Sequence, residues 1–190
     1  MKPLLGGNVY EHELDGWSIR WESQSNYRHW CVQAHPMFER QVVVVMKNPG
    51  SLKGDGSNLK RDTTLRVLRR VGERVKCSWY VVNLFDFAST SSNDLYKCWK
   101  RRDGAGLVYR KIHIRRFCGI LFAHGDAPAE VHREYEERIA LVRKIFKKFP
   151  EIRIPATKAG NPVHPLNWQR NRLIEPVVKL IRRQLTAVAS

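Results

Sequence analysis

Apolar residues follow two different patterns along the chain. Residues 17–21 alternate, with two tryptophans and an isoleucine on one side of the segment, and residues 27–33 alternate in much the same way. A period of two predicts half-exposed strands, which we expect to form a hairpin at the edge of a sheet. Residues 41–46 contain four consecutive valines instead, which is typical of a buried strand in a parallel sheet.

Further apolar segments extend this pattern toward the C-terminus. Core strands are predicted at residues 78–84, 119–123 and 152–156. Helices are predicted at three places: from an N-cap at Asp62, over residues 128–149, and from about Arg170 to the C-terminus. A long polar loop is expected over residues 86–103.

Buried strands that alternate with helices predict the α/β class. We expect a three-layer α/β/α sandwich with a mostly parallel central sheet of about four strands plus an N-terminal β-hairpin. The chain should form a single domain over residues 1–190, in which residues 1–40 supply the N-terminal strands and residues 41–190 the α/β core.

The charge balance points to a polyanionic partner. The chain has 34 Lys and Arg against 18 Asp and Glu, a formal net charge of +16. The basic residues are interleaved with aromatic ones, so the charge is expected on a folded surface rather than on a tail. Nucleic acid is the leading candidate and a membrane surface the second, while a solvated basic surface without a partner remains the plain alternative.

Polar residues follow several of the predicted strands, where an α/β sheet binds its ligands. The first group is Lys47, Asn48, Pro49 and Gly50 after the valine strand, the second is Asn83, the third is His124, and the fourth is a loop that contains Asn161, His164, Pro165 and Asn167. Each also has a structural reading as a turn or strand cap. Their expected convergence on one edge of the sheet favours a functional site.

Other kinds of site fit less well. The sequence has no P-loop or dinucleotide-binding fingerprint, no HExxH motif and no GxSxG elbow. We therefore expect neither a metal nor a cofactor. No window has the ~18 apolar residues of a membrane span, and no apolar signal core stands at the N-terminus, so we expect a monomer in the cytoplasm or nucleoid with no membrane partner.

These motifs, in this order, resemble the uracil-DNA glycosylase-like superfamily. Asn48-Pro49-Gly50 is similar to the Asn-Pro-Gly motif of the mismatch-specific thymine/uracil branch, and His164-Pro165 to the His-Pro loop of the uracil-specific branch. A second resemblance, spanning residues 27–183, is to an uncharacterised bacterial family with Asn-Pro-Ser, Val-Asn-Leu-Phe and His-Pro-Leu motifs. It implies the same fold but no activity.

The first resemblance implies a monofunctional DNA glycosylase, which extrudes a base from the stack and hydrolyses its N-glycosidic bond. Asn48 would position the attacking water, and His164 would hydrogen-bond the departing base or a flanking phosphate. Asn83 would read the base edge and Phe85 would stack on it. The DNA phosphates would be held by Lys47, Lys53, Lys60, Arg61, Lys100, Arg101, Arg102, Lys158, Arg170 and Arg172.

Gly50 suggests which base is removed. In the uracil-specific branch a tyrosine stands at the matching place and blocks the 5-position, whereas a glycine leaves the pocket wall open. We expect a pyrimidine modified at its 5-position, which would make the protein an antiviral defence enzyme, or a mismatched or deaminated pyrimidine, which would imply repair. Lys47, Asn161, Asn167 and the loop of Lys53 would supply polar partners. The space left by Gly50 could instead be refilled by Phe87 or Trp168.

Two other classes of function stay open. One is a non-catalytic nucleic-acid-binding module on the same fold. The other is a metal-dependent nuclease or nucleotide-processing enzyme, for which Asp55, Asp86 and Asp126 could supply carboxylates.

Overall fold

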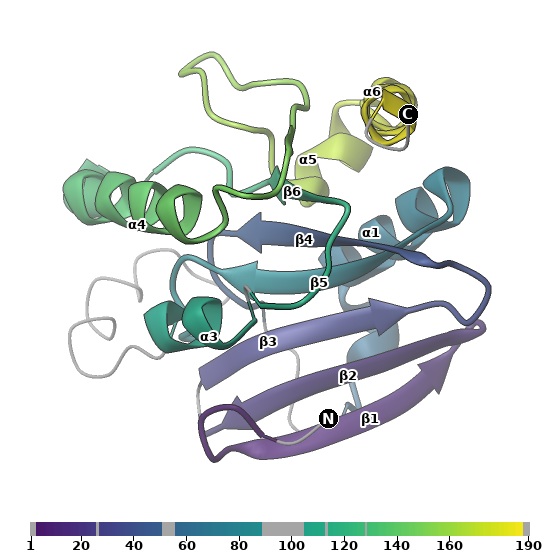
Figure 1. Cartoon of the computed structure of the whole chain (residues 1–190), viewed down its shortest axis with the longest axis vertical. Coiled ribbons are helices and arrows are strands. Elements are labelled where there is room, and N and C mark those ends of the chain that lie inside the picture. Colours follow the sequence, from purple (N-terminus) through teal and green to yellow (C-terminus); the bar gives the residue numbers. More distant parts are fainter. Residues whose placement is uncertain are drawn as a thin grey trace.

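The computed structural model describes residues 3–25, 27–50, 56–88, 105–112, 114–127 and 129–187 (Figure 1). Seven strands of these residues form one mixed sheet in the order β1-β2-β3-β5-β4-β6-β7. The strands are β1 (Asn8–Leu14), β2 (Trp17–Gln24), β3 (Tyr27–Ala34), β4 (Arg40–Met46), β5 (Cys77–Asn83), β6 (Gly119–Phe122) and β7 (Glu151–Ile152).

The prediction of a mostly parallel sheet of about four strands is wrong. The pairs β1-β2, β2-β3 and β3-β5 are antiparallel, and only the β5-β4-β6-β7 half of the sheet is parallel. The N-terminal segment adds three strands rather than a two-stranded hairpin, because β1 (Asn8–Leu14), which was not predicted, pairs with β2 along its whole length. The pairing of β3 with β5 makes it an interior strand, which explains why it is buried on both faces instead of half-exposed.

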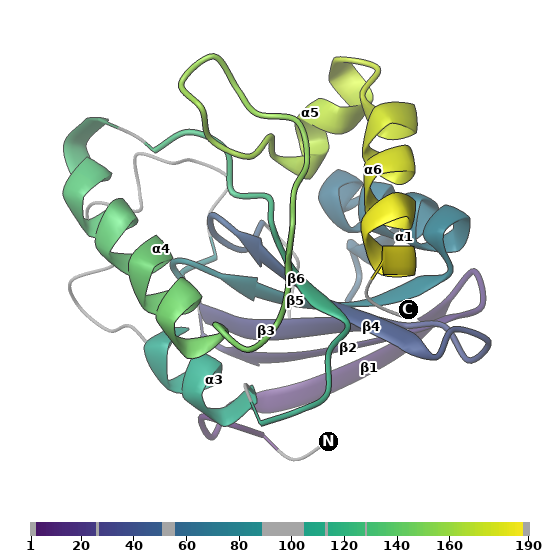
Figure 2. The same cartoon turned by 45° about the horizontal axis from the view of Figure 1, so that its top comes forward.

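Helices cover both faces of this sheet (Figure 2). One face carries α1 (Thr63–Val75), α5 (Pro165–Arg170) and α6 (Ile174–Ala187); the other carries α3 (Ala105–Ile112) and α4 (His132–Ile145). Two short 3-10 helices, η1 (Leu59–Arg61) and η2 (Ala129–Val131), precede α1 and α4. The predicted helix over 128–149 is thus shorter, the last predicted helix corresponds to α6, and neither α3 nor α5 was predicted.

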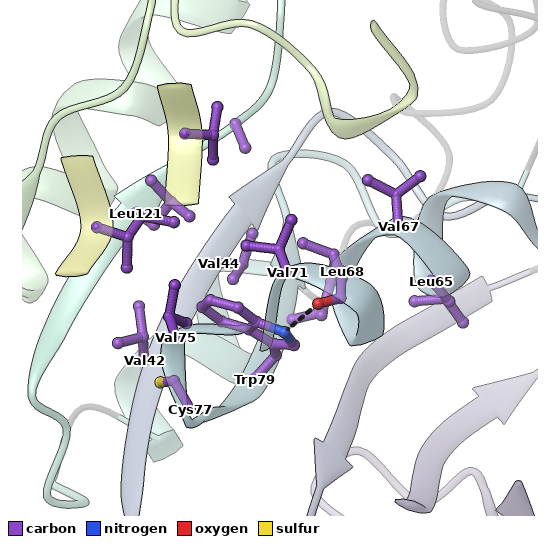
Figure 3. Packing of buried hydrophobic residues seen from close by; sticks show 14 of the residues in the cluster. Val42, Val44, Leu65, Val67, Leu68, Val71, Val75, Cys77, Trp79 and Leu121 are labelled. Atoms are coloured by element: carbon purple, nitrogen blue, oxygen red, sulfur yellow. Dashed lines mark hydrogen bonds between the residues drawn. The ribbon is translucent and has the colours of Figure 1, made fainter. Parts of the chain in front are cut away.

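The core beneath α1 shows how closely helix and sheet approach (Figure 3). The predicted N-cap is confirmed, since the Asp62 side chain accepts a hydrogen bond from the Leu65 amide. One turn before the end of α1, a Cβ added to Gly72 would lie 2.7 Å from the carbonyl oxygen of Cys77 and from the ring of Trp79. Only glycine lets the helix lie against the sheet at this point, so that the Trp79 indole can donate to the Leu68 carbonyl (2.6 Å).

Candidate functional site

A cavity of about 400 Å³ opens where β4 ends and α1 begins. Residues from four parts of the chain line it: Arg28 from β3; Met46, Asn48 and Gly50 from the end of β4; Arg61, Asp62, Thr63, Thr64 and Leu65 around the start of α1; and His164, Leu166 and Arg170 at α5. Five of the residues singled out in the sequence, Asn48, Gly50, Arg61, His164 and Arg170, meet here. We call this cavity the strand-end pocket.

The sheet topology explains this convergence. β4 points its carboxyl end at the pocket, and β5, its parallel neighbour, ends at the same edge. β3 runs antiparallel to β5, so its first residues lie at that edge too, and the amide of Arg28 donates to the carbonyl of Asp86 just past β5 (2.8 Å). Residues far apart in the sequence are therefore brought to one rim.

A β-bulge turns the side chain of Arg28 toward the pocket. Glu22 of β2 pairs with Trp30, whereas the next residue, Ser23, pairs with Arg28, so His29 is the extra residue on β3. Trp30 packs in the core on the α3 and α4 face, and regular alternation would place Arg28 on that same face. The extra residue reverses the alternation, and Arg28 lies on the α1 face among the pocket residues.

The environment of Arg28 is unusual for a guanidinium group. The residue is 2% exposed, and within the described part of the chain neither its Nε nor its Nη1 has a hydrogen-bond partner. Its nearest opposite charge is Asp62, whose Oδ2 lies 3.9 Å from Nη1 while its Oδ1 caps α1. Buried charges are normally paired and hydrogen-bonded, so this side chain has unused donor capacity facing the pocket.

His164 is fixed by the loops on either side of it. The carbonyl of Pro162 accepts from the Gly125 amide (2.9 Å), and the carbonyl of Val163 accepts from the Trp168 indole (2.7 Å). Gly125 has a φ of +72°, and a Cβ added to it would lie 3.3 Å from the Cβ of His164. The loop that follows β6 therefore packs directly against the histidine.

A hydrogen bond to Nδ1 of the ring assigns the tautomer of His164. The Leu166 amide donates to Nδ1 (3.3 Å), which makes His164 the N-cap of α5 and places the ring proton on Nε2. Burial, followed by the positive charge of Lys47, lowers the pKa of His164 to about 4. The ring is therefore neutral at physiological pH and can serve as a hydrogen-bond donor through Nε2.

This depressed pKa makes a prediction for stability. The unfolded chain binds a proton at His164 near pH 6.5 and the folded chain only near pH 4, so stability should fall as the pH is lowered across that interval. His164→Asn keeps a capping side chain without a titrating ring. Urea unfolding at several pH values should show the wild type losing up to about 3 kcal/mol more than the variant between pH 7 and pH 4. Parallel losses in the two proteins would contradict this assignment.

Asn48 and Gly50 form the wall of the pocket at the end of β4. The Asn48 amide nitrogen donates to the Pro49 carbonyl (2.9 Å), which fixes the orientation of the side chain, while Pro49 itself is buried. A Cβ added to Gly50 would lie 3.6 Å from Oδ2 of Asp62, an ordinary contact. Neither Phe87 nor Trp168 is among the described residues that line the pocket, so neither refills the space beside Gly50.

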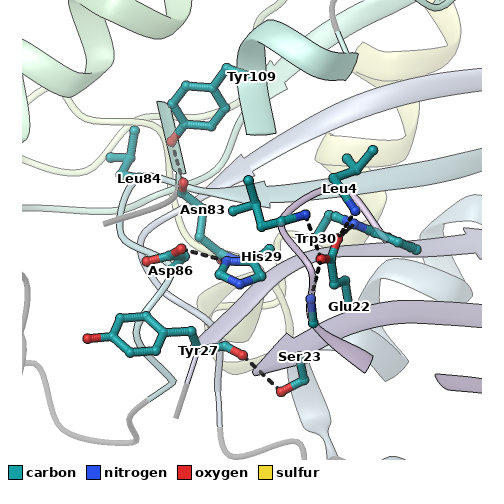
Figure 4. A network of polar contacts seen from close by, with 12 residues as sticks. Leu4, Glu22, Ser23, Tyr27, His29, Trp30, Asn83, Leu84, Asp86 and Tyr109 are labelled. Carbon is teal, nitrogen blue, oxygen red and sulfur yellow. Dashed lines mark hydrogen bonds and ion pairs between the residues drawn. The ribbon is translucent and has the colours of Figure 1, made fainter. Parts of the chain in front are cut away.

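Three predicted site residues are buried elsewhere. Asn83 is 3% exposed at the end of β5, and its carbonyl accepts a hydrogen bond from the Tyr109 hydroxyl (Figure 4). Phe85 lies in the core of the α3 and α4 face, under the guanidinium group of Arg138. Stacking of Phe85 on a base in the strand-end pocket is therefore ruled out by its position, and Asn83 does not line the pocket.

His124 is the third of these residues. It is 1% exposed, and burial lowers its pKa, so it is a neutral core residue. Its Nδ1 lies 3.3 Å from the Tyr135 hydroxyl and 2.8 Å from the Gly125 carbonyl. These contacts give His124 a role in shaping the loop that holds His164.

The remaining predicted residues lie around or away from the pocket. Asn161 donates to Asp126 (2.9 Å), Pro165 is the buried first residue of α5, and Lys47 and Asn167 are half-buried without lining the pocket. Polar partners for a base substituent must therefore come from other residues. Lys60, Lys158 and Arg172 are exposed outside the pocket lining. Lys53, Asp55, Lys100, Arg101 and Arg102 lie outside the described residues.

Two of the three carboxylates proposed for a metal-dependent nuclease are engaged elsewhere, and the third, Asp55, lies outside the described residues. Asp86 holds His29, and Asp126 accepts from both Thr157 (2.5 Å) and Asn161. Those two hydrogen bonds lower the pKa of Asp126. No group of three or more potential metal ligands occurs among the residues that the structure describes.

Seven residues that line the pocket were not predicted as site residues: Arg28, Met46, Asp62, Thr63, Thr64, Leu65 and Leu166. The two threonines begin α1, directly after the N-cap that was recognised. Arg28 carried one usable signal, since it stands beside a histidine in a segment that is otherwise largely apolar. Its position on the pocket face depends on the bulge, which no local pattern indicated.

Comparison with known proteins places the chain in a family. A search of curated proteins finds no match. None of the helices in the described residues combines the length and apolar character that a membrane span requires. A family model described as "Protein of unknown function (DUF1643)" matches residues 27–166, which include β3, the end of β4 and His164. The chain therefore belongs to the DUF1643 family.

Proposed function

We propose that this protein is a monofunctional DNA glycosylase that hydrolyses the N-glycosidic bond of an extruded base. The observation that carries the proposal is the strand-end pocket, in which Asn48, Gly50 and His164 share one cavity with arginines. The formal net charge of +16 suits a polyanionic substrate. We further propose that the protein acts as a monomer on DNA in the cytoplasm or nucleoid.

The chemistry is divided between two walls of the pocket. Cleavage builds positive charge on the sugar and negative charge on the departing base. Asn48 would position the water that attacks the sugar, and an amide is too weak a base to do more. His164 would donate a hydrogen bond from Nε2 to the departing base, and a neutral, fixed donor stabilises that charge without reorganising.

The open wall at Gly50 supports a substrate larger than uracil. The size of the pocket alone changes the free-energy difference between two competing bases by only ~1–3 kcal/mol. Selection of a 5-modified base therefore also requires polar partners for its substituent. The described pocket offers the side chains of Asp62 and Thr64 for this purpose, in place of Lys47 and Asn161. A pyrimidine with a polar 5-substituent fits this lining, and a mismatched or deaminated pyrimidine is the second candidate.

DNA binding should weaken steeply with salt. Each phosphate contact should contribute about −0.9 to the slope of log affinity against log salt concentration for duplex DNA. Neutralising the exposed Arg61 at the pocket with Arg61→Gln should make the slope shallower by about that amount. Fluorescence anisotropy over a salt series measures both values, and a flat response of the wild type would contradict a nucleic-acid partner.

A further inference from the structure

We propose that the strand-end pocket contains a built subsite for a phosphate group, centred on Arg28 and the first turn of α1. That the phosphate is a DNA phosphodiester beside the extruded nucleotide rests on the proposed function; the anion site itself does not. Three features of the pocket that are independent of catalysis support this subsite.

The first feature is the buried cation. Arg28 is 2% exposed, and its Nε and Nη1 have no hydrogen-bond partner within the described residues. The 3.9 Å separation from Asp62 brings Coulombic attraction but no hydrogen bond. A guanidinium group removed from water in this way is strongly stabilised by an anion that accepts its N–H groups.

The second feature is the start of α1, which lines the same pocket. The amides of Thr63 and Thr64 are the first two of the helix and have no hydrogen-bond acceptor within it. The Asp62 side chain caps only the Leu65 amide. Thr63 and Thr64 thus bring the positive end of the helix dipole to the pocket that Arg28 also lines.

The third feature is the charge of the lining. The lining contains three arginines, Arg28, Arg61 and Arg170, and one carboxylate, that of Asp62. His164 is neutral because its pKa is lowered. The donors come from several directions: a strand, a helix start and the exposed rim. A tetrahedral phosphate, with oxygens pointing several ways, suits donors on several sides of a pocket better than a planar carboxylate does.

The β-bulge connects this subsite to the fold. Without the extra residue at His29, Arg28 would lie on the α3 and α4 face, away from the pocket. Bulges often re-aim a side chain beside a site. The bulge thus places the guanidinium group of Arg28 in the buried part of the pocket, whereas Arg61 and Arg170 are exposed.

Isothermal titration calorimetry on the full chain tests the subsite without any catalytic readout. The probes are inorganic phosphate, a deoxynucleoside 5′-monophosphate and the matching uncharged nucleoside, at constant ionic strength. We expect both phosphates to bind and the nucleoside to bind at least about tenfold more weakly. Arg28→Lys, which keeps the charge but loses the planar fork, should weaken phosphate binding about tenfold.

Exposed arginines provide variants that do not disturb the core. Arg61→Gln combined with Arg170→Gln should weaken phosphate binding at least about fivefold, whereas Arg66→Gln, an exposed arginine of α1 outside the pocket, should leave it unchanged. If Arg28→Lys fails to fold, the double variant and its control still decide the matter. Absence of phosphate binding to the wild type, or equal binding to the double variant and the wild type, would overturn the subsite.

The source of the phosphate is resolved by competition. A short single-stranded oligonucleotide should displace the monophosphate if the subsite holds a DNA phosphodiester. Phosphate binding without displacement would keep the subsite and overturn its assignment to DNA. A protein that binds phosphate through Arg28 but releases no base would retain this inference and refute the glycosylase, while base release without phosphate binding would do the reverse.

Discussion

His164→Asn should lower the rate of base release by about 100-fold or more while the protein stays folded. Asparagine can cap α5 as His164 does, by accepting from the Leu166 amide, but it is too short to present a donor where Nε2 stands. Loss of one fixed donor to a departing anion typically costs 10²–10³ in rate, a range that serves as a rough expectation here. Single-turnover release of free base, measured on the preferred DNA, gives the value.

Asn48→Ala provides the companion variant at the opposite wall of the pocket. It removes the amide that would position water and should also abolish release, while salt-dependent DNA binding is unchanged in both variants. Asn171→Ala, an exposed amide at the end of α5, is the control and should retain full activity. Full activity of either pocket variant would remove the role assigned to that residue, and unfolding of both would indicate that the two loops are purely structural.

Glu22→Ala should lower the free energy of unfolding by about 3–5 kcal/mol, the largest stability effect we expect from a polar residue. Its carboxylate is fully buried in β2 and accepts from the amides of Leu4, Leu5 and Gly7 and from the Trp30 indole, at 2.6 to 3.0 Å (Figure 4). Truncation would leave these donors buried without an acceptor, and would loosen the N-terminal segment from the sheet.

The matched control is Glu11→Ala on the neighbouring strand β1. Glu11 is exposed and pairs with Arg20 at the surface, so its loss should leave the urea midpoint almost unchanged. Burial would raise the pKa of Glu22, but its hydrogen bonds outweigh burial and lower it. The contribution of Glu22 is therefore present above pH 4.5 and lost as the pH falls through the lowered pKa. Similar urea midpoints for the two variants at pH 7 would contradict this account.

The strands that form the centre of the sheet were predictable because their runs of consecutive apolar residues indicate burial. The valines of β4 are apolar on both faces, and such a run has no stable place except an interior strand. β1 was missed because it is an edge strand whose exposed and half-buried residues give no continuous apolar signal. A mostly parallel sheet was mispredicted because no local pattern shows that the N-terminal strands join the same sheet. The pairing of β3 with β5 adds the antiparallel strands β1, β2 and β3 to the parallel half.

The candidate site was predictable only where a strand ends in a motif. Asn48, Gly50 and His164 could be predicted as site residues because the carboxyl ends of parallel strands lie at one edge of a sheet. Phe85 follows a strand as well, yet it belongs to the core of the opposite face. Arg28 was missed for a related reason, since a one-residue bulge decides its face and an arginine is ordinarily read as a surface charge.

Base release from defined DNA tests the central claim most directly. Duplexes that contain only ordinary bases, uracil, or a pyrimidine with a polar 5-substituent are incubated with the wild type and with His164→Asn, and free bases are identified by mass spectrometry. The account predicts release of the 5-modified pyrimidine by the wild type, with little release from ordinary DNA and at least about 100-fold less by the variant. Release of no base from any of the three duplexes, by a folded protein that binds them, would contradict it.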